Sequence, residues 1–487
     1  PAPGGRSQKG GPLGRAGIGG LITSSLLTLL VVPVFYTLLE DVINRLKRLR
    51  AKSAVVPLLL ALLLWPRPGM SEEFVPTRRL TLDEALKLTF ENNKDILKAR
   101  ESENRVHGYY LEQRAAAFPQ ITAVSAVSRE KDESRAAQGM GLFDVPEYSD
   151  FNVAELRLSQ VIFTWGQVAA AIRGAKEMMG AADAQTIMAE QGAIKDVSVA
   201  FYDILLAGDM HDLALQNISQ KQRHLDEARH KYAAGTATDY DVLSSRVALE
   251  NARPEAIRTE NALALARERF RFLLALKDEK PDASGTLDVT IEECPSVDKV
   301  LETALANRPE VAFLQHNLLM TKEKVVIANS LNKPRLDFKS GYGYRDLTME
   351  QYDDSFNGEG DAWSLGLYLT WPLFDGGRTK GLTAQAVSEA KSLELDIRNI
   401  YDTLVLQVRQ AVNAVKDAGE IVLALGETVT QAERMLAMAE QGYKYGVMTR
   451  LDVDDAALNL LHAQSSLARG KRDYLVARLT LEWTMGK

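Results

Sequence analysis

An internal duplication constrains this chain more than any other feature of its sequence. The motif Tyr-x-x-Gly-x-x-Thr-x-x-Asp-Val begins at Tyr232 and again at Tyr443, 211 residues later. Such a repeat predicts two copies of one structural unit that pack together, and we place the copies at residues 78–290 and 296–487. Further matched pairs lie at this spacing or at 215 residues: Phe163 and Phe374, Gly166 and Gly377, Asn92 and Asn307, Pro119 and Pro334.

Two stretches of the second copy, 335–345 and 362–372, alternate between apolar and polar residues, which is the period of a β-strand. A half-buried strand of a soluble sheet has the same period. However, the segment 346–361 between them is rich in Asp, Gly and Asn and is expected to be an extracellular loop. A strand of this length with tryptophan at both ends of its apolar face is typical of a transmembrane β-barrel. The belt expected to face lipid consists of Trp363, Leu365, Leu367, Leu369 and Trp371.

The first copy repeats this design with expected strands at 119–128 and 151–163, in which leucines alternate with charged residues. Four strands cannot enclose a useful channel, and an open sheet edge in lipid would leave backbone groups without hydrogen bonds. The sequence therefore predicts an oligomer. Three chains would supply a barrel of twelve strands.

The rest of each copy is expected to be long helix. No proline occurs between Gly377 and Gly442, so one helix could extend through ~65 residues, or about 100 Å. The stretch from Gln167 to Tyr232 also lacks proline. Apolar residues recur every three or four positions from Leu404 to Leu436, which indicates a coiled-coil seam. The predicted fold class is mainly α, with long coiled-coil helices and a transmembrane β-barrel contribution.

The duplicated motif has the chemistry of a turn between two helices. Its glycine is expected to end one helix, its threonine to cap the next, and its aspartate to complete the cap. These residues are Gly235, Thr238 and Asp241 in the first copy and Gly446, Thr449 and Asp452 in the second.

Several classes of function have little support. The net charge is −7 and no basic stripe is present, which argues against a nucleic-acid partner. A single cysteine, Cys294, and six scattered histidines offer no metal-ligand pattern, and common nucleotide and hydrolase motifs are missing. We therefore expect no catalytic residues, no cofactor, no metal and no enzyme activity.

The first 71 residues are expected to lie outside the folded protein. The apolar run Ile18–Leu39 resembles the last transmembrane helix of RND-type inner-membrane transporters, and we interpret residues 1–45 as read-through from an upstream transporter reading frame. Residues 46–71, with the shorter apolar run Ala54–Trp65, have the anatomy of a signal peptide. A genuine two-helix membrane anchor remains the alternative. No cysteine follows the second run to carry an N-terminal lipid.

Three motifs in order resemble the outer membrane efflux protein (TolC) family: Asn307-Arg308-Pro309-Glu310, the segment 371–378 after a strand, and the tip motif 443–453. The resemblance implies a homotrimer with a twelve-stranded barrel in the outer membrane and a helical periplasmic tunnel. It also implies a passive conduit for small molecules and drugs, with a periplasmic membrane-fusion adaptor and an RND inner-membrane transporter as partners. Alternatives are a channel for type I secretion or metal efflux, or a non-channel coiled-coil scaffold.

The resemblance also implies site residues. The periplasmic gate matches Tyr443, Asp452 and Asp455, and three copies of the two aspartates would form an acidic ring that favours cations. An arginine common in the family is replaced by Met448, and Arg450 is a candidate substitute. The tips expected to dock the adaptor contain Gly235, Thr236, Thr238, Gly446, Val447 and Thr449.

Overall fold

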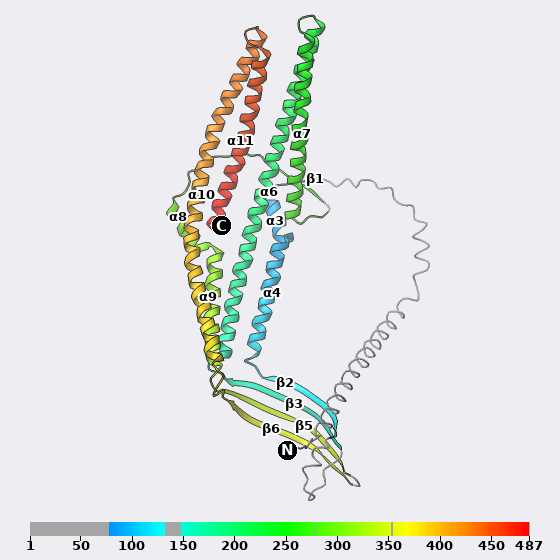
Figure 1. Cartoon of the computed structure of the whole chain (residues 1–487), viewed down its shortest axis with the longest axis vertical. Helices are drawn as coiled ribbons and strands as arrows, with labels where there is room; N and C mark the ends of the chain where they lie inside the picture. The colour runs from blue at the N-terminus through cyan, green and yellow to red at the C-terminus, as the bar shows by residue number, and fades with distance from the viewer. Residues whose placement is uncertain (1–76, 132–147, 278, 352–353, 487) are drawn as a thin grey trace, which may run out of the picture. The chain divides into compact units, whose positions relative to one another are not determined.

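The structure, a computed structural model, describes residues 77–131, 148–277, 279–351 and 354–486 (Figure 1). The expectations for residues 1–45 and 46–71 concern a segment outside these ranges. No helix among the described residues combines the length and apolar character needed to cross a membrane.

The two halves of the chain contain the same helices in the same order. Each half begins with two short helices, continues with two strands, and ends with a 67-residue helix and a 35-residue helix that form a hairpin. The first half contains α3 (Leu82–Asn92), α4 (Lys94–Ala115), α6 (Gln167–Ala233) and α7 (Asp239–Leu273). The second half contains α8 (Val297–Asn307), α9 (Pro309–Ser330), α10 (Arg378–Lys444) and α11 (Arg450–Thr484).

Four long strands form one antiparallel sheet in the order β2-β3-β5-β6. They are β2 (Gln120–Glu130), β3 (Tyr148–Phe163), β5 (Arg335–Gln351) and β6 (Asp354–Thr370). Two short strands, β1 (Thr77–Leu80) and β4 (Lys280–Ala283), pair in parallel elsewhere. The long strands lie at one end of the helices, and the hairpin tips lie at the other (Figure 1).

The apolar seam of α10 explains why so long a helix is stable. A 67-residue helix is about 100 Å long, and helices of this length gain most of their stability from packing of one face. Members of the predicted seam are buried against neighbouring helices: Leu404, Val408, Ala411, Val415, Val422 and Ala432. Alanine at several of these positions lets helix backbones approach closely.

The register of the sheet brings the apolar residues of all four strands to one face. Residues directly opposite each other in antiparallel strands point to the same side. Leu156 lies opposite Tyr342, which in turn lies opposite Trp363. The other face is polar, and Glu155 there accepts hydrogen bonds from Arg157 and, at 3.1 Å, from Arg345. The sheet therefore has one face suited to lipid and one suited to water.

The expected loop at 346–361 is wrong, because the structure continues both strands through most of it. Asp346 pairs with Glu359 and Leu347 with Gly358. Trp371, expected within the second strand, lies one residue beyond its end at Thr370. Beyond the apolar band both faces of the sheet carry polar residues, so the strands lose their alternating pattern and their composition resembles that of a loop.

Glycine at position 343 permits the close pairing of β3 and β5. A Cβ atom at Gly343 would lie 2.3 Å from the backbone oxygen of Ala154, and a backbone atom cannot move aside as a flexible side chain can. We expect Gly343→Val to cost more than about 3 kcal/mol and to prevent stable assembly. The control is Gly360→Val, since a Cβ at Gly360 meets nothing within 4 Å. Thermal unfolding of both variants tests this, and equal stability would contradict it.

Two apolar cores hold the middle of the long helices. One joins α8, α10 and α11 through buried residues that include Val300, Val412 and Tyr474. The other joins β1, α3, α6 and α7 through Leu80, Phe201, Phe270 and others. These cores fix the helices far from their tips.

The Asn-Arg-Pro-Glu motif clamps the last helix to the second core region. The buried Arg308 guanidinium donates a 3.0 Å hydrogen bond to the backbone oxygen of Trp483 and lies 4.1 Å from that indole ring. Glu310 pairs with Arg308 at 3.0 Å. Burial lowers the pKa of Arg308, while the charge of Glu310 opposes this shift. The motif thus has a structural role at the end of α11.

Candidate gate at the helical tips

Each hairpin tip is built by the duplicated motif. Gly235 and Gly446 adopt left-handed backbone conformations, with φ of 74° and 78°, which end α6 and α10. Thr238 and Thr449 then cap α7 and α11 in reciprocal capping boxes. The capping geometry is as the sequence predicts, and it makes each tip a short, rigid turn.

Tyr443 connects the two hairpins. Its hydroxyl oxygen accepts a hydrogen bond from the Lys231 ammonium at 3.2 Å, and the ammonium lies 4.5 Å from the ring centroid. Lys231 also pairs with Glu227 at 2.7 Å. The hydrogen bond from Lys231 to Glu227 is the main reason that the pKa of Lys231 is raised, so this lysine stays charged. The last turn of α10 is thereby held to the last turn of α6.

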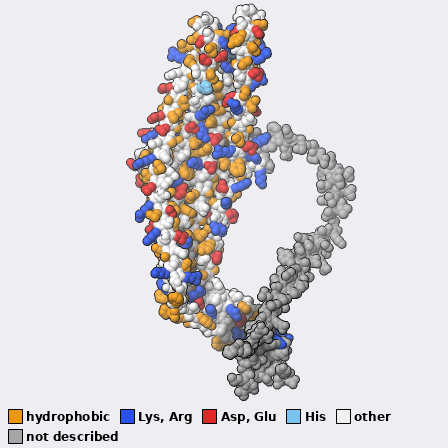
Figure 2. All heavy atoms as spheres, viewed as in Figure 1, with side chains coloured by type: hydrophobic (Ala, Val, Ile, Leu, Met, Phe, Trp, Pro, Cys, Tyr) orange, Lys and Arg blue, Asp and Glu red, His pale blue; other side chains and the backbone are white. Residues whose placement is uncertain are grey.

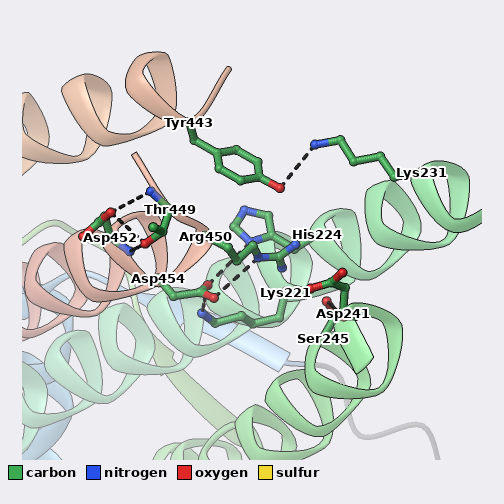
Figure 3. Close-up of polar contacts among 10 residues, drawn as sticks. All are labelled: Lys221, His224, Lys231, Asp241, Ser245, Tyr443, Thr449, Arg450, Asp452 and Asp454. Atoms are coloured by element: carbon green, nitrogen blue, oxygen red, sulfur yellow. Dashed lines mark hydrogen bonds and ion pairs between the residues drawn. The ribbon is translucent and has the colours of Figure 1, made fainter. Parts of the chain in front are cut away.

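A second connection centres on Asp454, which sequence analysis missed (Figure 3). Lys221 of α6 donates to the Asp454 carboxylate at 2.8 Å, and Arg450 lies 3.5 Å from its other oxygen. The His224 ring nitrogen is 3.6 Å away. Residues from two elements more than 200 positions apart in the chain therefore share one carboxylate.

The charge of Asp454 is strongly favoured by its surroundings. Burial alone would raise its pKa, but His224, Lys221 and Arg450 together hold the pKa of this carboxyl well below its usual range. Because the folded value lies below the unfolded value, the stabilisation is fully present above the ordinary aspartate pKa of about 3.9 and is lost only as the pH falls through the lowered value. The connection therefore persists throughout the physiological pH range.

The space between the two tips is polar rather than close-packed. A cavity of about 350 Å³ lies between them and is lined by residues of both hairpins, including Lys231, Asp241, Tyr443, Arg450 and Asp454. The apolar cluster nearest the tip, Ala439, Val453 and Ala456, lies within the second hairpin alone. Polar contacts that can exchange with water, and not an apolar core, therefore hold the tips together.

Asp452 and Asp455, predicted as gate residues, lie on a different side of α11 from Asp454. They line a groove of about 430 Å³ together with Met435, Met438 and Met448. The Asp452 carboxylate accepts 2.7 Å hydrogen bonds from the Thr449 hydroxyl and backbone amide, which lower its pKa. Asp452 is therefore both a capping residue and a permanent negative charge.

The residues expected to replace the family arginine have separate positions. The Met448 side chain covers Gly442, where an added Cβ would lie 2.9 Å from the sulfur atom. Arg450 instead takes part in the Asp454 cluster. Val447 and Tyr445 are exposed at the tip. In the described ranges, no group of three or more His, Cys, Asp or Glu side chains is arranged to hold a metal ion.

The opposite end of this unit carries the expected lipid-facing belt. Trp363, Leu365, Leu367 and Leu369 share one face of β6 and are exposed in the single chain. Hydrophobic side chains also gather where the helices meet the sheet (Figure 2). Six apolar residues at these junctions are exposed: Phe118, Phe163, Trp165, Trp371, Leu373 and Phe374.

Comparisons with known proteins agree with this geometry. The sequence matches the profile of the family described as "Outer membrane efflux protein" over residues 85–276 and 300–487. It is 23% identical to the outer membrane protein TolC of Vibrio cholerae, over 81% of this chain and 88% of that protein. It is 24% identical to the alkaline protease secretion protein AprF of Pseudomonas aeruginosa, over 82% and 83% of the two chains. The outer membrane channel CmeC of Campylobacter jejuni has a similar structure, with a TM-score of 0.73, 17% identity, and coverage of 83% of this chain and 85% of that one.

Proposed function

Since this chain belongs to the outer membrane efflux protein family, we propose that it assembles as a homotrimer whose twelve strands close a barrel in the outer membrane. The observation that carries the proposal is the sheet. Its outer strands β2 and β6 each have one unpaired edge in the single chain, while one face is apolar across all four strands. Open edges in lipid are unstable, and pairing of β6 with β2 of a neighbour would remove them.

The long helices would then form a tunnel that extends into the periplasm. A passive conduit of this kind needs no catalytic group. We propose that it receives small molecules and drugs from an RND inner-membrane transporter through a periplasmic adaptor, which would bind at the tips formed by residues 235–238 and 446–449. A protein-secretion channel is the second candidate, because one relative is named for alkaline protease secretion.

The test is conductance in planar lipid bilayers, with protein that begins at Ser71 and is refolded in detergent. Chemical cross-linking of the same sample counts its subunits. Stable pores from a trimer are expected. A non-conducting, water-soluble coiled coil would contradict the barrel and favour a scaffold.

We further propose that the tip is the gate, closed by the contacts of Tyr443 and Asp454 with α6. The middle of the long helices is fixed by apolar cores, whereas the tips are joined through polar contacts around a cavity. Movement of the α10/α11 tip away from α6 would break only the Lys231–Tyr443 and Lys221–Asp454 contacts. Opening therefore requires no rearrangement of a core.

The aspartates in the groove are expected to control which ions pass. Three copies of Asp452 and Asp455 would concentrate negative charge at the narrow end and attract cations. We expect Asp452→Ala/Asp455→Ala to weaken block by divalent cations at least tenfold in single-channel recordings. Thr449→Ala is the control, because it disrupts the same helix cap but keeps both carboxylates. Unchanged block in the double variant would exclude an acidic ring.

A further inference from the structure

Trp165, between β3 and α6, has a backbone conformation that tryptophan rarely adopts. Its φ is 54°, in the left-handed region that favours glycine. The position 211 residues later, related by the duplication, is Gly376, with φ of 65°. Residues held in such conformations tend to occur where the side chain serves a function. The indole of Trp165 therefore needs an explanation beyond the turn.

The contacts of this indole fix it at the edge of the apolar face of the sheet. Its N–H donates a 2.8 Å hydrogen bond to the backbone oxygen of Pro334, between α9 and β5. Its ring packs edge-to-face against Phe163, at 5.2 Å between centroids, and Phe163 lies opposite Leu336 on the apolar face. Trp165 remains 46% exposed. Tryptophan with an apolar body and a satisfied N–H is typical of the boundary between lipid tails and headgroups.

A cation accompanies the indole. The Lys333 ammonium lies 5.3 Å from the centroid of the Trp165 ring, and Lys333 is exposed. Among the described residues, this ammonium contacts the indole ring and forms no ion pair with a carboxylate. Its charge is therefore available to an anion at the same boundary.

The position within the sheet keeps this surface open in an oligomer. Trp165 follows β3 and Lys333 precedes β5, and these are the two inner strands of the four. A neighbouring chain that pairs at the edges β2 or β6 would not cover them. Lipid is then the component of the membrane that contacts this surface.

We propose that Trp165 and Lys333 bind the headgroup of an anionic phospholipid at the periplasmic boundary of the outer membrane. The indole packs against the glycerol and upper acyl chain, while the ammonium pairs with the phosphate. An anionic lipid is favoured over a zwitterionic one because the latter carries its own ammonium, which Lys333 would repel. The inference rests on the proposed barrel but not on the gate.

Native mass spectrometry of the purified trimer tests the site with phosphatidylglycerol and phosphatidylethanolamine as probes. Lys333→Gln is expected to reduce retained phosphatidylglycerol at least threefold and to leave phosphatidylethanolamine unchanged. Lys322→Gln is the matched control, since it removes the same charge from the same helix about 16 Å away and there pairs with Glu394. Equal retention by the two variants would overturn the proposal.

Quenching of tryptophan fluorescence provides a second test that does not depend on Lys333. Phosphatidylglycerol brominated near the headgroup is expected to quench the wild type more than Trp165→Phe, and inorganic phosphate is expected to have no such effect. No difference between wild type and Trp165→Phe, or an equal effect of phosphate alone, would overturn the proposal. Normal pore conductance in Lys333→Gln would show that such a failure concerns the lipid site and not the channel.

Discussion

Replacement of Asp454 by asparagine is expected to open the tip of the channel. The substitution keeps the shape of the side chain but removes the one negative charge shared by Lys221, His224 and Arg450. Loss of one partner of a fully buried ion pair costs 3–5 kcal/mol, and for this half-buried site we expect about 1–2 kcal/mol in each protomer after solvent screening. Over three protomers the closed state loses enough free energy to raise the open probability at least tenfold.

Single-channel recordings of Asp454→Asn measure this effect directly. Addition of Lys221→Met to the same chain removes one of the cations left without a partner, so the double variant is expected to regain part of the closed population. An open probability equal to that of the wild type in Asp454→Asn would exclude Asp454 as a closing contact. An effect with no recovery in the double variant would indicate that repulsion between the remaining cations is not the cause.

A charge in the middle of the lipid-facing belt is expected to prevent assembly of the barrel. Leu367 lies near the centre of the apolar face and is 67% exposed in the single chain. Leu367→Arg should cost about 2–4 kcal/mol in each protomer, because an arginine near the bilayer midplane loses its hydration. The fraction of protein that refolds as a trimer in liposomes is the measurement, and we expect a loss of at least tenfold.

The control for this variant uses the opposite face of the same strand. Ser364 is exposed and lies opposite Gly341, whose missing side chain leaves room for a longer neighbour. Ser364→Arg is therefore expected to assemble almost normally, since its charge would meet water. Equal loss of assembly in both variants would show that the apolar face does not contact lipid.

The long helices could be predicted to within a few residues because their limits are set by local chemistry. The absence of proline, the seam from Leu404 onward and the duplicated glycine and threonine define α10 from the sequence alone. Family membership, inferred from three motifs, is likewise confirmed by the comparisons. Periodicity also located the strands wherever one face is apolar.

What the sequence could not predict depends on contacts between distant segments. Nothing near Asp454 indicates that Lys221, 233 residues earlier, supplies its partner. The adjacent Asp455 appears equally acidic, and only the orientation of α11 against α6 distinguishes the two. The strained Trp165 was missed for the same reason, since its hydrogen bond to Pro334 spans 169 residues.

The equal lengths of the two hairpins restrict how this protein can change size during evolution. Deletion of one residue from α6 would shorten that helix by about 1.5 Å and rotate everything beyond the deletion by about 100°. Lys221 would then point away from Asp454 unless α10 lost a residue at a corresponding level. Insertions and deletions in the helices are therefore tolerated mainly as matched pairs, or as whole multiples of the helical repeat. The identical 67- and 35-residue lengths in both halves are consistent with such paired selection.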